Sequence, residues 1–291
     1  MIKLVTQMKF IYSYSLFWRF ARYQYILYRI LLRIKIGKKR RDEYFRKKRI
    51  SEYDFLPERT YLMESGVKAV PRRGTRDFQM LFVSREHTLR SYLIMQPDET
   101  FVDVGANVGS YSLHIAQKNR DQNVKVIAIE AHEGNYRALC RNIQCNNFEE
   151  IIKPIHMVVS NYKGKTSLYE RSHDGSRVDS EMYSICKDRV IDSYNILHPS
   201  GNSSEVACDT LDNILINEKA DVIKVDVEGA EIMVLEGATE TMKRIRRMVV
   251  EIHGDRFEGV KRLLLSQGFL LEDIKDHEQM SYIIGTKMRN E

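Results

Sequence analysis

The stretch Phe101-Val102-Asp103-Val104-Gly105-Ala106-Asn107-Val108-Gly109-Ser110 decides the fold of this chain. It begins as an apolar run, passes through a glycine-containing loop, and continues with helical spacing. Gly105 permits a tight turn, and Gly109 lets the following helix approach the strand closely. A strand, a glycine loop and a helix in this order present backbone N–H groups to a ligand, so the stretch predicts a nucleotide-type site.

The loop differs from the fingerprint of a dinucleotide site. That fingerprint, G-x-G-x-x-G, has a glycine where the backbone touches the pyrophosphate, and here Asn107 stands between Gly105 and Gly109. Asp103 precedes the loop, and a carboxylate there suits a ligand that carries an ammonium and a sulfonium. Glu130 ends the next apolar run, where a carboxylate can accept both hydroxyls of a ribose. Together these residues favour S-adenosylmethionine over NAD.

Apolar runs and helical periodicity alternate through the rest of the chain. The runs that predict strands are Phe101–Val104, Val124–Ile129, Ile155–Val159, Val222–Asp226, Met248–Ile252, Phe269–Asp273 and Tyr282–Gly285. The segments that predict helices are Glu86–Met95, Ser110–Lys118, Glu133–Asn146, Gly229–Met242 and Phe257–Gln267. Because several runs are continuously apolar, the sheet should be buried on both faces. The pattern predicts a doubly wound, seven-stranded, Rossmann-like α/β fold with its ligand at the carboxyl ends of the strands.

The ordered blocks of this part of the chain resemble the FkbM-type methyltransferase family. The resemblance runs from about Arg73 to Lys287. Its blocks are Gly74-Thr75-Arg76-Asp77, the glycine-loop stretch, Glu130, Thr210-Leu211-Asp212, Ile223-Lys224-Val225-Asp226-Val227-Glu228-Gly229-Ala230-Glu231 and Val250-Glu251-Ile252-His253. The two blocks 210–212 and 223–231 are far more specific than the glycine loop. Ala131 departs from the family, which usually carries proline after the acidic residue.

The resemblance implies a class I methyltransferase fold and S-adenosylmethionine as cofactor. It also implies a preference for transfer to oxygen. The cofactor-binding residues that it implies are Asp103, Gly105, Asn107, Gly109 and Glu130, with Ser160 and Asn161 near the adenine. In this assignment Asp103 holds the amino end of the methionine and Glu130 holds the ribose. The alternative for Asp103 is the N-cap of the following helix.

Two pairs of polar residues end the fourth and fifth predicted strands. Asp226 and Glu228 follow one strand, and Glu251 and His253 follow the next. Alternation along a strand points the members of each pair in the same direction, so four polar groups should surround one crevice. The ordinary pKa of histidine lies near neutrality, so His253 is the natural general base, with Asp226 orienting it or binding the acceptor hydroxyl. These residue types could also hold Mg²⁺ or Mn²⁺, but spacing across two strands is not a metal motif, and we expect no metal.

Several residues of the same blocks have structural explanations. The run from Glu228 to Glu231 also reads as a helix start, where carboxylates favour the helix dipole. Lys224 lies in a buried strand and needs a carboxylate partner, for which Glu251 is a candidate. Asp212 can simply cap the helix that follows it.

The first 60 residues form a separate, basic segment. They hold 16 Lys and Arg against 5 Asp and Glu, whereas residues 61–291 hold 30 against 35, so the basic excess belongs to this segment alone. Arg19, Arg22, Arg29 and Arg33 share one side of a predicted helix, and Phe and Leu residues share the other. We expect an aromatic, amphipathic helical arm (1–60) attached to a methyltransferase domain (61–291). Residues 10–49 of the arm could pack on the domain, lie on an anionic membrane, or bind RNA.

Residues 170–205 are polar and separate the third strand from the fourth. A long connection of this kind is either a substrate lid or a passive insertion, and we favour the lid. The four cysteines form no metal or disulfide motif, which favours a reducing compartment. No run is long enough to cross a bilayer, so we expect a cytoplasmic protein that can lie at the inner face of a membrane.

These patterns predict an S-adenosylmethionine-dependent O-methyltransferase acting on a sugar, a glycolipid or a small metabolite. Its partner would be a small-molecule, glycan or lipid acceptor rather than nucleic acid. Two alternatives stay open: an RNA methyltransferase that uses the basic arm, and a catalytically silent protein that docks on membranes.

Overall fold

The computed structural model describes residues 13–41, 59–63, 65–82, 87–172, 183–186, 190–191, 196–275 and 281–287. The chain divides into two compact units, residues 1–84 and 85–291, and each is described by itself. The expected boundary at residue 60 stays a prediction.

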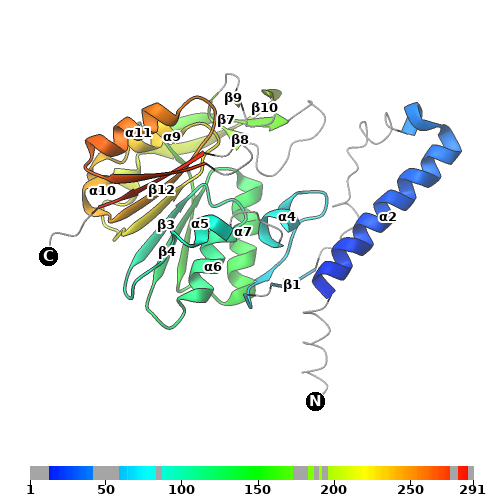
Figure 1. The fold of residues 1–291 in the computed structure, drawn as a ribbon, viewed down its shortest axis with the longest axis horizontal. Coiled ribbons are helices and arrows are strands. Elements are labelled where there is room, and N and C mark those ends of the chain that lie inside the picture. Colours follow the sequence, from blue (N-terminus) through cyan, green and yellow to red (C-terminus); the bar gives the residue numbers. More distant parts are fainter. Residues whose placement is uncertain are drawn as a thin grey trace, which may run out of the picture. The chain divides into compact units, whose positions relative to one another are not determined.

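The first unit carries the helical arm and a small folded segment. The arm is α2 (Ser13–Ile36), the long blue helix of Figure 1. The folded segment has an antiparallel pair, β1 (Tyr61–Leu62) and β2 (Lys68–Ala69), and a short helix, α4 (Asp77–Phe82). The guanidinium of Arg72 donates to both carboxylate oxygens of Asp77 at the first turn of α4, at 2.7 and 2.8 Å.

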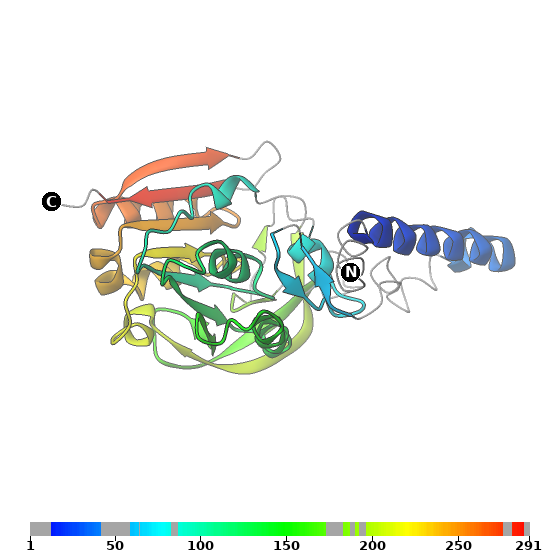
Figure 2. The same cartoon turned by 90° about the horizontal axis from the view of Figure 1, so that it is seen from below.

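A seven-stranded sheet forms the centre of the second unit. Its strands are β3 (Thr100–Val104), β4 (Lys125–Glu130), β5 (Ile152–His156), β11 (Val222–Val225), β12 (Arg247–Ile252), β13 (Leu270–Lys275) and β14 (Ser281–Thr286). They lie in the order β13-β14-β12-β11-β3-β4-β5, and β14 alone runs against its neighbours in the sheet, as the red arrow of Figure 2 shows. The predicted seven-stranded α/β fold is confirmed.

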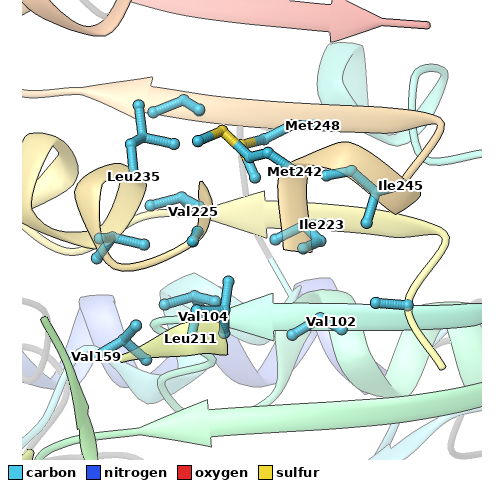
Figure 3. Packing of buried hydrophobic residues seen from close by; sticks show 14 of the residues in the cluster. Val102, Val104, Val159, Leu211, Ile223, Val225, Leu235, Met242, Ile245 and Met248 are labelled. Carbon is cyan, nitrogen blue, oxygen red and sulfur yellow. The ribbon is translucent and has the colours of Figure 1, made fainter. Parts of the chain in front are cut away.

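Helices cover both faces of this sheet, as the continuously apolar strands require. One face carries α6 (Ser110–Lys118) and α7 (Glu133–Asn146), and the other carries α9 (Glu231–Glu236), α10 (Thr239–Arg244) and α11 (Phe257–Ser266) (Figure 1). A short helix, α8 (Leu211–Ile214), adds Leu211 to the second layer. Figure 3 shows strand residues Val104 and Val225 packed in the same apolar cluster as Leu235 and Met242 from the helices. This core fixes the strand ends that carry the polar residues.

The predicted third strand is divided between two sheets. Residues 152–156 form β5, but β6 (Val158–Val159) leaves the central sheet and pairs with β10 (Ile196–Asp209). Strands β7 (Gly164–Ser172) and β8 (Tyr183–Ser184) complete this second sheet, and β9 (Val190–Ile191) pairs with β10. The described residues of the segment 170–205 extend a β-hairpin. The interpretation of this segment as a substrate lid stays a prediction. Residues 173–182, 187–189 and 192–195 of that segment lie outside the described residues.

Two predicted helices are shorter than expected. The segment 229–242 breaks at Gly237 into α9 and α10. A Cβ on Gly237 would lie 2.1 Å from the Ser160 carbonyl oxygen, so this position requires glycine. In the segment 86–95 the described helix is α5 (His87–Arg90). The carbonyls of Tyr92 and Ile94 accept hydrogen bonds from Arg247 and Arg246 instead of continuing a helical ladder.

Candidate active site

The glycine loop lies where the strand order of the central sheet reverses, between β3 and β11. The amides of Gly105 and Ala106 donate to the Ile129 carbonyl at the end of β4. Gly105 has φ +81°, and a Cβ there would lie 1.8 Å from the Asp226 carbonyl oxygen. Asn107 also adopts a left-handed conformation, with φ +50°, which asparagine tolerates better than most residues. The loop is therefore held closely between the ends of three strands.

Asp103, at the end of β3, is completely buried. Its Oδ2 accepts a 2.6 Å hydrogen bond from the Ser112 hydroxyl in the first turn of α6. Its Oδ1 has no hydrogen-bond partner among the described residues and lies 3.8 Å from the Lys224 ammonium. Burial raises the pKa of Asp103, and Lys224 and Ser112 oppose this shift. The N-cap position of α6 is Gly109, so Asp103 is not the N-cap residue. Its carboxylate nevertheless interacts with both the hydroxyl and the backbone amide of Ser112 in the first turn of α6.

Glu130 occupies the end of the neighbouring strand, β4. Its Oε2 accepts from the Asn107 amide at 2.8 Å, and its Oε1 accepts from the His132 amide at 2.9 Å. The Asn135 side chain donates to Oε1 at 3.4 Å. Burial raises the pKa of Glu130 to about 7, although the amides of His132 and Asn107 favour its ionised form. Glu130 thus joins the glycine loop to the end of β4.

The four residues proposed for catalysis come together around the ring of His253. Its Nε2 lies 3.6 Å from Glu228 Oε2 and 3.7 Å from Glu251 Oε1. Its Nδ1 lies 2.9 Å from Oε1 of Glu231, the first residue of α9. A carboxylate oxygen of Asp226 lies within 4.8 Å of a carboxylate oxygen of Glu251 and of a ring nitrogen of His253.

The surrounding carboxylates control the charge of the His253 ring. Burial by itself lowers the pKa of this histidine. The negative charges of Glu228, Glu231 and Glu251 outweigh that effect and hold the pKa well above its ordinary value of 6.5. The ring therefore carries a proton at neutral pH in this structure.

The orientation of Asp226 and Glu228 has a different origin from the one expected. Strand β11 ends at Val225, so both residues lie in the turn after it and not in an alternating strand. Glu228 has φ +51° and Gly229 has φ +102°, which places both in the left-handed region. The turn, rather than strand alternation, brings the Glu228 carboxylate toward His253.

The buried Lys224 bridges Asp103 on β3 and Asp226 in the turn after β11. Its ammonium lies 3.1 Å from Asp226 Oδ2 and 3.8 Å from Asp103 Oδ1, and it also faces the ring of Tyr111. A carboxylate partner for Lys224 is confirmed in Asp226 and Asp103. The expected pairing with Glu251 stays a prediction.

Asp226, Glu251 and His253 form a group whose ligand atoms could approach one divalent cation. These atoms lie within 4.8 Å of one another, and two of the three residues are buried. No sequence motif marks this group, because its residues come from two segments that are distant in the chain. For these residues an acid–base role is proposed below.

Ser160 and Asn161 lie at the junction of β6 with α9. The Ser160 amide donates to the Asp209 carbonyl, and Ser160 is fully buried against Gly237. The Asn161 side chain donates to Glu236 at 2.8 Å. Their assignment to the adenine stays a prediction.

A short described part of the insertion contacts both ends of the site. The ring of Tyr183 stacks on His132, which follows β4, with centroids 3.7 Å apart and planes at 11°. The thiol of Cys186 donates to the carbonyl of Gly229, which follows β11, at 3.2 Å. Residues 183–186 thus reach from the Glu130 strand end to the Glu228 turn.

Residues 103–276 match the model of the Methyltransferase FkbM domain, which covers more than half of the chain. The chain belongs to the FkbM methyltransferase family. This assignment confirms the family expected from the ordered blocks, and it identifies the fold around the site as a methyltransferase domain.

Individual relatives of this FkbM methyltransferase are distant. Methyltransferase sdnD of Sordaria araneosa is 27% identical over 179 residues, which cover 52% of this chain and 64% of that protein. Hexuronic acid methyltransferase AglP of Haloferax volcanii is 23% identical over 206 residues, 67% of this chain and 73% of that protein. The match with a crystal structure of Methyltransferase FkbM from Methylobacillus flagellatus KT covers 68% of this chain and 47% of the chain in that crystal structure, with 17% identity and a TM-score of 0.47. The chain thus spans less than two thirds of sdnD.

S-adenosylmethionine is the cofactor of this methyltransferase family, and the residues at the two strand ends fit its groups. Asp103 Oδ1 and Asn107 Oδ1 are buried oxygens without hydrogen-bond partners among the described residues, which suits the ammonium of the methionine end. The oxygens of Glu130 keep lone pairs beyond those used by the backbone amides, which suits two ribose hydroxyls.

Sequence reasoning missed residues of this FkbM site that act through contacts between distant segments. Glu231 was interpreted as a helix start, and only the fold brings it to His253. Tyr183 and Cys186 carry no motif at all. The available signal was weak: Glu231 lies inside the specific block 223–231.

Proposed function

We propose that the protein transfers a methyl group from S-adenosylmethionine to a hydroxyl of a sugar, a glycolipid or another small metabolite. The observation that carries this proposal is the set of carboxylates around His253, namely Glu228, Glu251 and the nearby Asp226. Carboxylates accept hydrogen bonds from hydroxyl groups and repel phosphates. The site therefore favours a polyhydroxyl acceptor over RNA, and one relative is named a hexuronic acid methyltransferase.

The proposed chemistry divides between the cofactor and the chain. S-adenosylmethionine supplies a methyl group that its sulfonium activates. The acceptor hydroxyl must lose its proton as the new C–O bond forms, and Nε2 of the neutral His253 ring, the form present above its raised pKa, takes that proton. Asp226, Glu228 and Glu251 accept hydrogen bonds from the acceptor and hold the reacting oxygen in line.

The insertion 170–205 serves in this proposal as a substrate lid. The contacts of Tyr183 with His132 and of Cys186 with Gly229 support it, because they lie at both ends of the site. A lid in this position excludes water from the transfer. Replacement of Tyr183 by Ala should raise the KM of the acceptor more than the Kd of S-adenosylhomocysteine.

Calorimetric titration with S-adenosylhomocysteine, beside NAD, tests the cofactor site without turnover. We expect 1:1 binding of S-adenosylhomocysteine that is lost in Glu130→Ala, and no binding of NAD. Binding of NAD instead, or no binding of either, would mean that the assignment of the glycine loop is wrong.

Once binding is established, a panel of monosaccharides, glycolipids and RNA is assayed for methyl transfer. Transfer to RNA alone would overturn the acceptor assignment, and no transfer to any hydroxyl would favour the silent alternative.

The arm carries a second proposed activity, docking on an anionic membrane surface. Six apolar residues of α2 are 40 to 77% exposed: Tyr23, Ile26, Leu27, Ile30, Leu31 and Ile34. By helical spacing they share one face, and Arg29 and Arg33 border it. No acidic residue occurs before Asp42, so the segment is purely cationic. Exposed apolar residues with basic neighbours suit anionic headgroups. None of the described helices has a span long and apolar enough to cross a membrane.

Vesicle sedimentation tests the proposed docking. The full chain should bind vesicles with anionic lipid and not purely zwitterionic vesicles, and Ile30→Asp with Ile34→Asp should abolish binding. Ile216→Asp is the matched control, because Ile216 is 70% exposed outside the arm. Equal binding by both variants would contradict docking through α2, and RNA binding that weakens steeply with salt would favour the RNA alternative.

The proposal places the protein in the cytoplasm at the inner face of a membrane, in keeping with its four free cysteines.

A further inference from the structure

Glu231 connects the two strand ends that carry the proposed catalytic residues. It is fully buried at the first position of α9. Its Oε1 accepts a 2.8 Å hydrogen bond from the Gly229 amide, and the same atom lies 2.9 Å from Nδ1 of His253. One carboxylate oxygen therefore joins the turn after β11 to the residue that follows β12.

The turn that Glu231 holds is strained. Glu228 adopts φ +51°, a left-handed conformation that is unfavourable for a residue with a Cβ. Such a conformation persists only where the surroundings determine it. The hydrogen bond from Gly229 to Glu231 fixes the peptide that follows Glu228, and in this arrangement the Glu228 carboxylate lies 3.6 Å from Nε2 of His253.

Glu231 also decides which nitrogen of His253 faces the other carboxylates. A hydrogen bond at one ring nitrogen determines which of the two carries the proton in the neutral ring. With Nδ1 donating to Glu231, Nε2 is left toward Glu228 and Glu251. Arg256 supports the same end of the strand, since its Nη1 donates to the His253 carbonyl and its Nε lies 3.9 Å from Glu231 Oε2.

We propose that Glu231 is a positioning residue: it fixes the ring of His253 with Nε2 toward the acceptor and holds the Glu228 turn against it. This inference rests on the proposed function, because the oriented nitrogen matters only where it accepts a proton. By comparison with other oriented histidine bases, loss of the carboxylate should lower kcat by about 100-fold or more. The affinity for S-adenosylhomocysteine should change little, because Glu231 has no described contact with Asp103 or Glu130.

The test combines nuclear magnetic resonance with binding. The full chain is labelled with ¹⁵N-histidine and studied in EDTA, at a pH where the His253 ring is neutral, and His253→Gln identifies the signals. We expect the wild-type ring to carry its proton on Nδ1. Glu231→Met removes the acceptor and should shift the ring toward the Nε2-protonated form, and Glu231→Gln should show a smaller shift. Glu240→Gln, an exposed carboxylate on α10, should behave as wild type.

The outcomes separate this inference from the proposed function. An unchanged Nδ1 proton in both Glu231 variants would overturn the positioning role, whether or not an acceptor is methylated. If Glu231→Met does not fold, Glu231→Gln decides the question. Failure of wild type to bind S-adenosylhomocysteine would instead overturn the proposed function and leave the ring orientation to be judged from its own signals. Once an acceptor is known, a fall in kcat with an unchanged KM for S-adenosylmethionine supports the role, and unchanged kcat contradicts it.

Discussion

The ammonium of Lys224 lies 3.1 Å from Oδ2 of Asp226, two residues further along the chain. The same ammonium lies 3.8 Å from Asp103 on the neighbouring strand, and Lys224 is 2% exposed. A buried ammonium between two carboxylates neutralises charge that the interior could not otherwise accommodate. Lys224 therefore links the carboxylate of Asp103 on β3 to the turn that follows β11.

Replacement of Lys224 by Met should destabilise the protein by about 3 to 5 kcal/mol, because it leaves buried carboxylates without their counter-charge. Urea denaturation followed by circular dichroism measures this difference. The double variant Lys224→Met with Asp103→Asn should recover part of the loss, since one unpaired charge is removed as well. Strict additivity of the two single variants would contradict the coupling between Lys224 and Asp103.

The affinity for S-adenosylhomocysteine should rise with pH through neutrality. The pKa of Glu130 is about 7, and ribose hydroxyls donate to the ionised carboxylate. Calorimetry at pH values below and above 7 measures the effect, which should approach tenfold per pH unit below the pKa. Glu130→Gln should bind weakly and lose this pH dependence. A wild-type affinity that is flat from pH 5 to pH 8 would show that Glu130 does not hold the ribose in its ionised form.

Glu130 should also make the free protein less stable as pH rises. Its folded pKa lies above the ordinary value of 4.5, so the folded state binds more protons than the unfolded state between pH 4.5 and about 7. Stability is unaffected below that range and falls by roughly 3 kcal/mol across it. In Glu130→Gln this fall should be absent, which urea denaturation at pH 4.5 and pH 8 can measure. A saturating concentration of S-adenosylhomocysteine should offset the fall in wild type only.

The strands of the central sheet could be predicted because their apolar runs are intrinsic to the sequence. All seven were expected, with bounds correct to within three residues, but the apolar pattern did not predict that β14 runs antiparallel to its neighbours. The second sheet, which residues 158–209 form, could not be predicted from the sequence, since Val158 pairs with Cys208 across fifty residues of chain. A period-2 pattern says nothing about which distant strand a segment will pair with.

The residues of the site could be found from the sequence, but their interactions could not. Asp103 and Glu130 end predicted strands, so their meeting at one edge follows from the topology. The left-handed turn at Glu228 depends on Glu231 accepting from Gly229, a contact that no periodicity reveals. The expectation for Asp212 was wrong for the same reason: it does not cap α8, whose N-cap is Thr210.

Asp212 instead caps α10, a helix that begins 27 residues later. Its carboxylate accepts from the amides of Glu240 and Thr241 at 3.0 and 2.6 Å. Asp212→Ala should cost about 1 to 2 kcal/mol of stability, the usual effect of losing a cap. Thermal unfolding measures the loss, and Asp212→Asn should lose less. The affinity for S-adenosylhomocysteine should not change, and a large change would indicate a role of Asp212 in the site.

Gly105 and Gly268 form a matched pair for testing the glycine loop. Both have positive φ, +81° and +78°, so alanine is strained at either position by about 1 to 2 kcal/mol. A Cβ on Gly268 meets nothing within 4 Å, whereas a Cβ on Gly105 would lie 1.8 Å from the Asp226 carbonyl oxygen. Gly268→Ala should therefore show the strain alone and retain S-adenosylhomocysteine binding. Gly105→Ala should lose binding and considerably more stability, and equal losses would show that the contact with Asp226 is not tight.

Methyl transfer should require a more alkaline pH than an ordinary histidine base. The raised pKa of His253 keeps the ring protonated at neutral pH, and only the neutral ring can take the acceptor proton. The logarithm of kcat should rise with unit slope up to that pKa.

The protonated His253 ring also stabilises the fold, fully below pH 6.5, and this contribution to stability is lost as pH rises through the raised pKa. His253→Gln should remove both dependences. Denaturation at several pH values needs no acceptor and tests the charge of the ring independently of turnover. A wild-type stability that does not fall relative to His253→Gln above pH 6.5 would contradict the protonated ring.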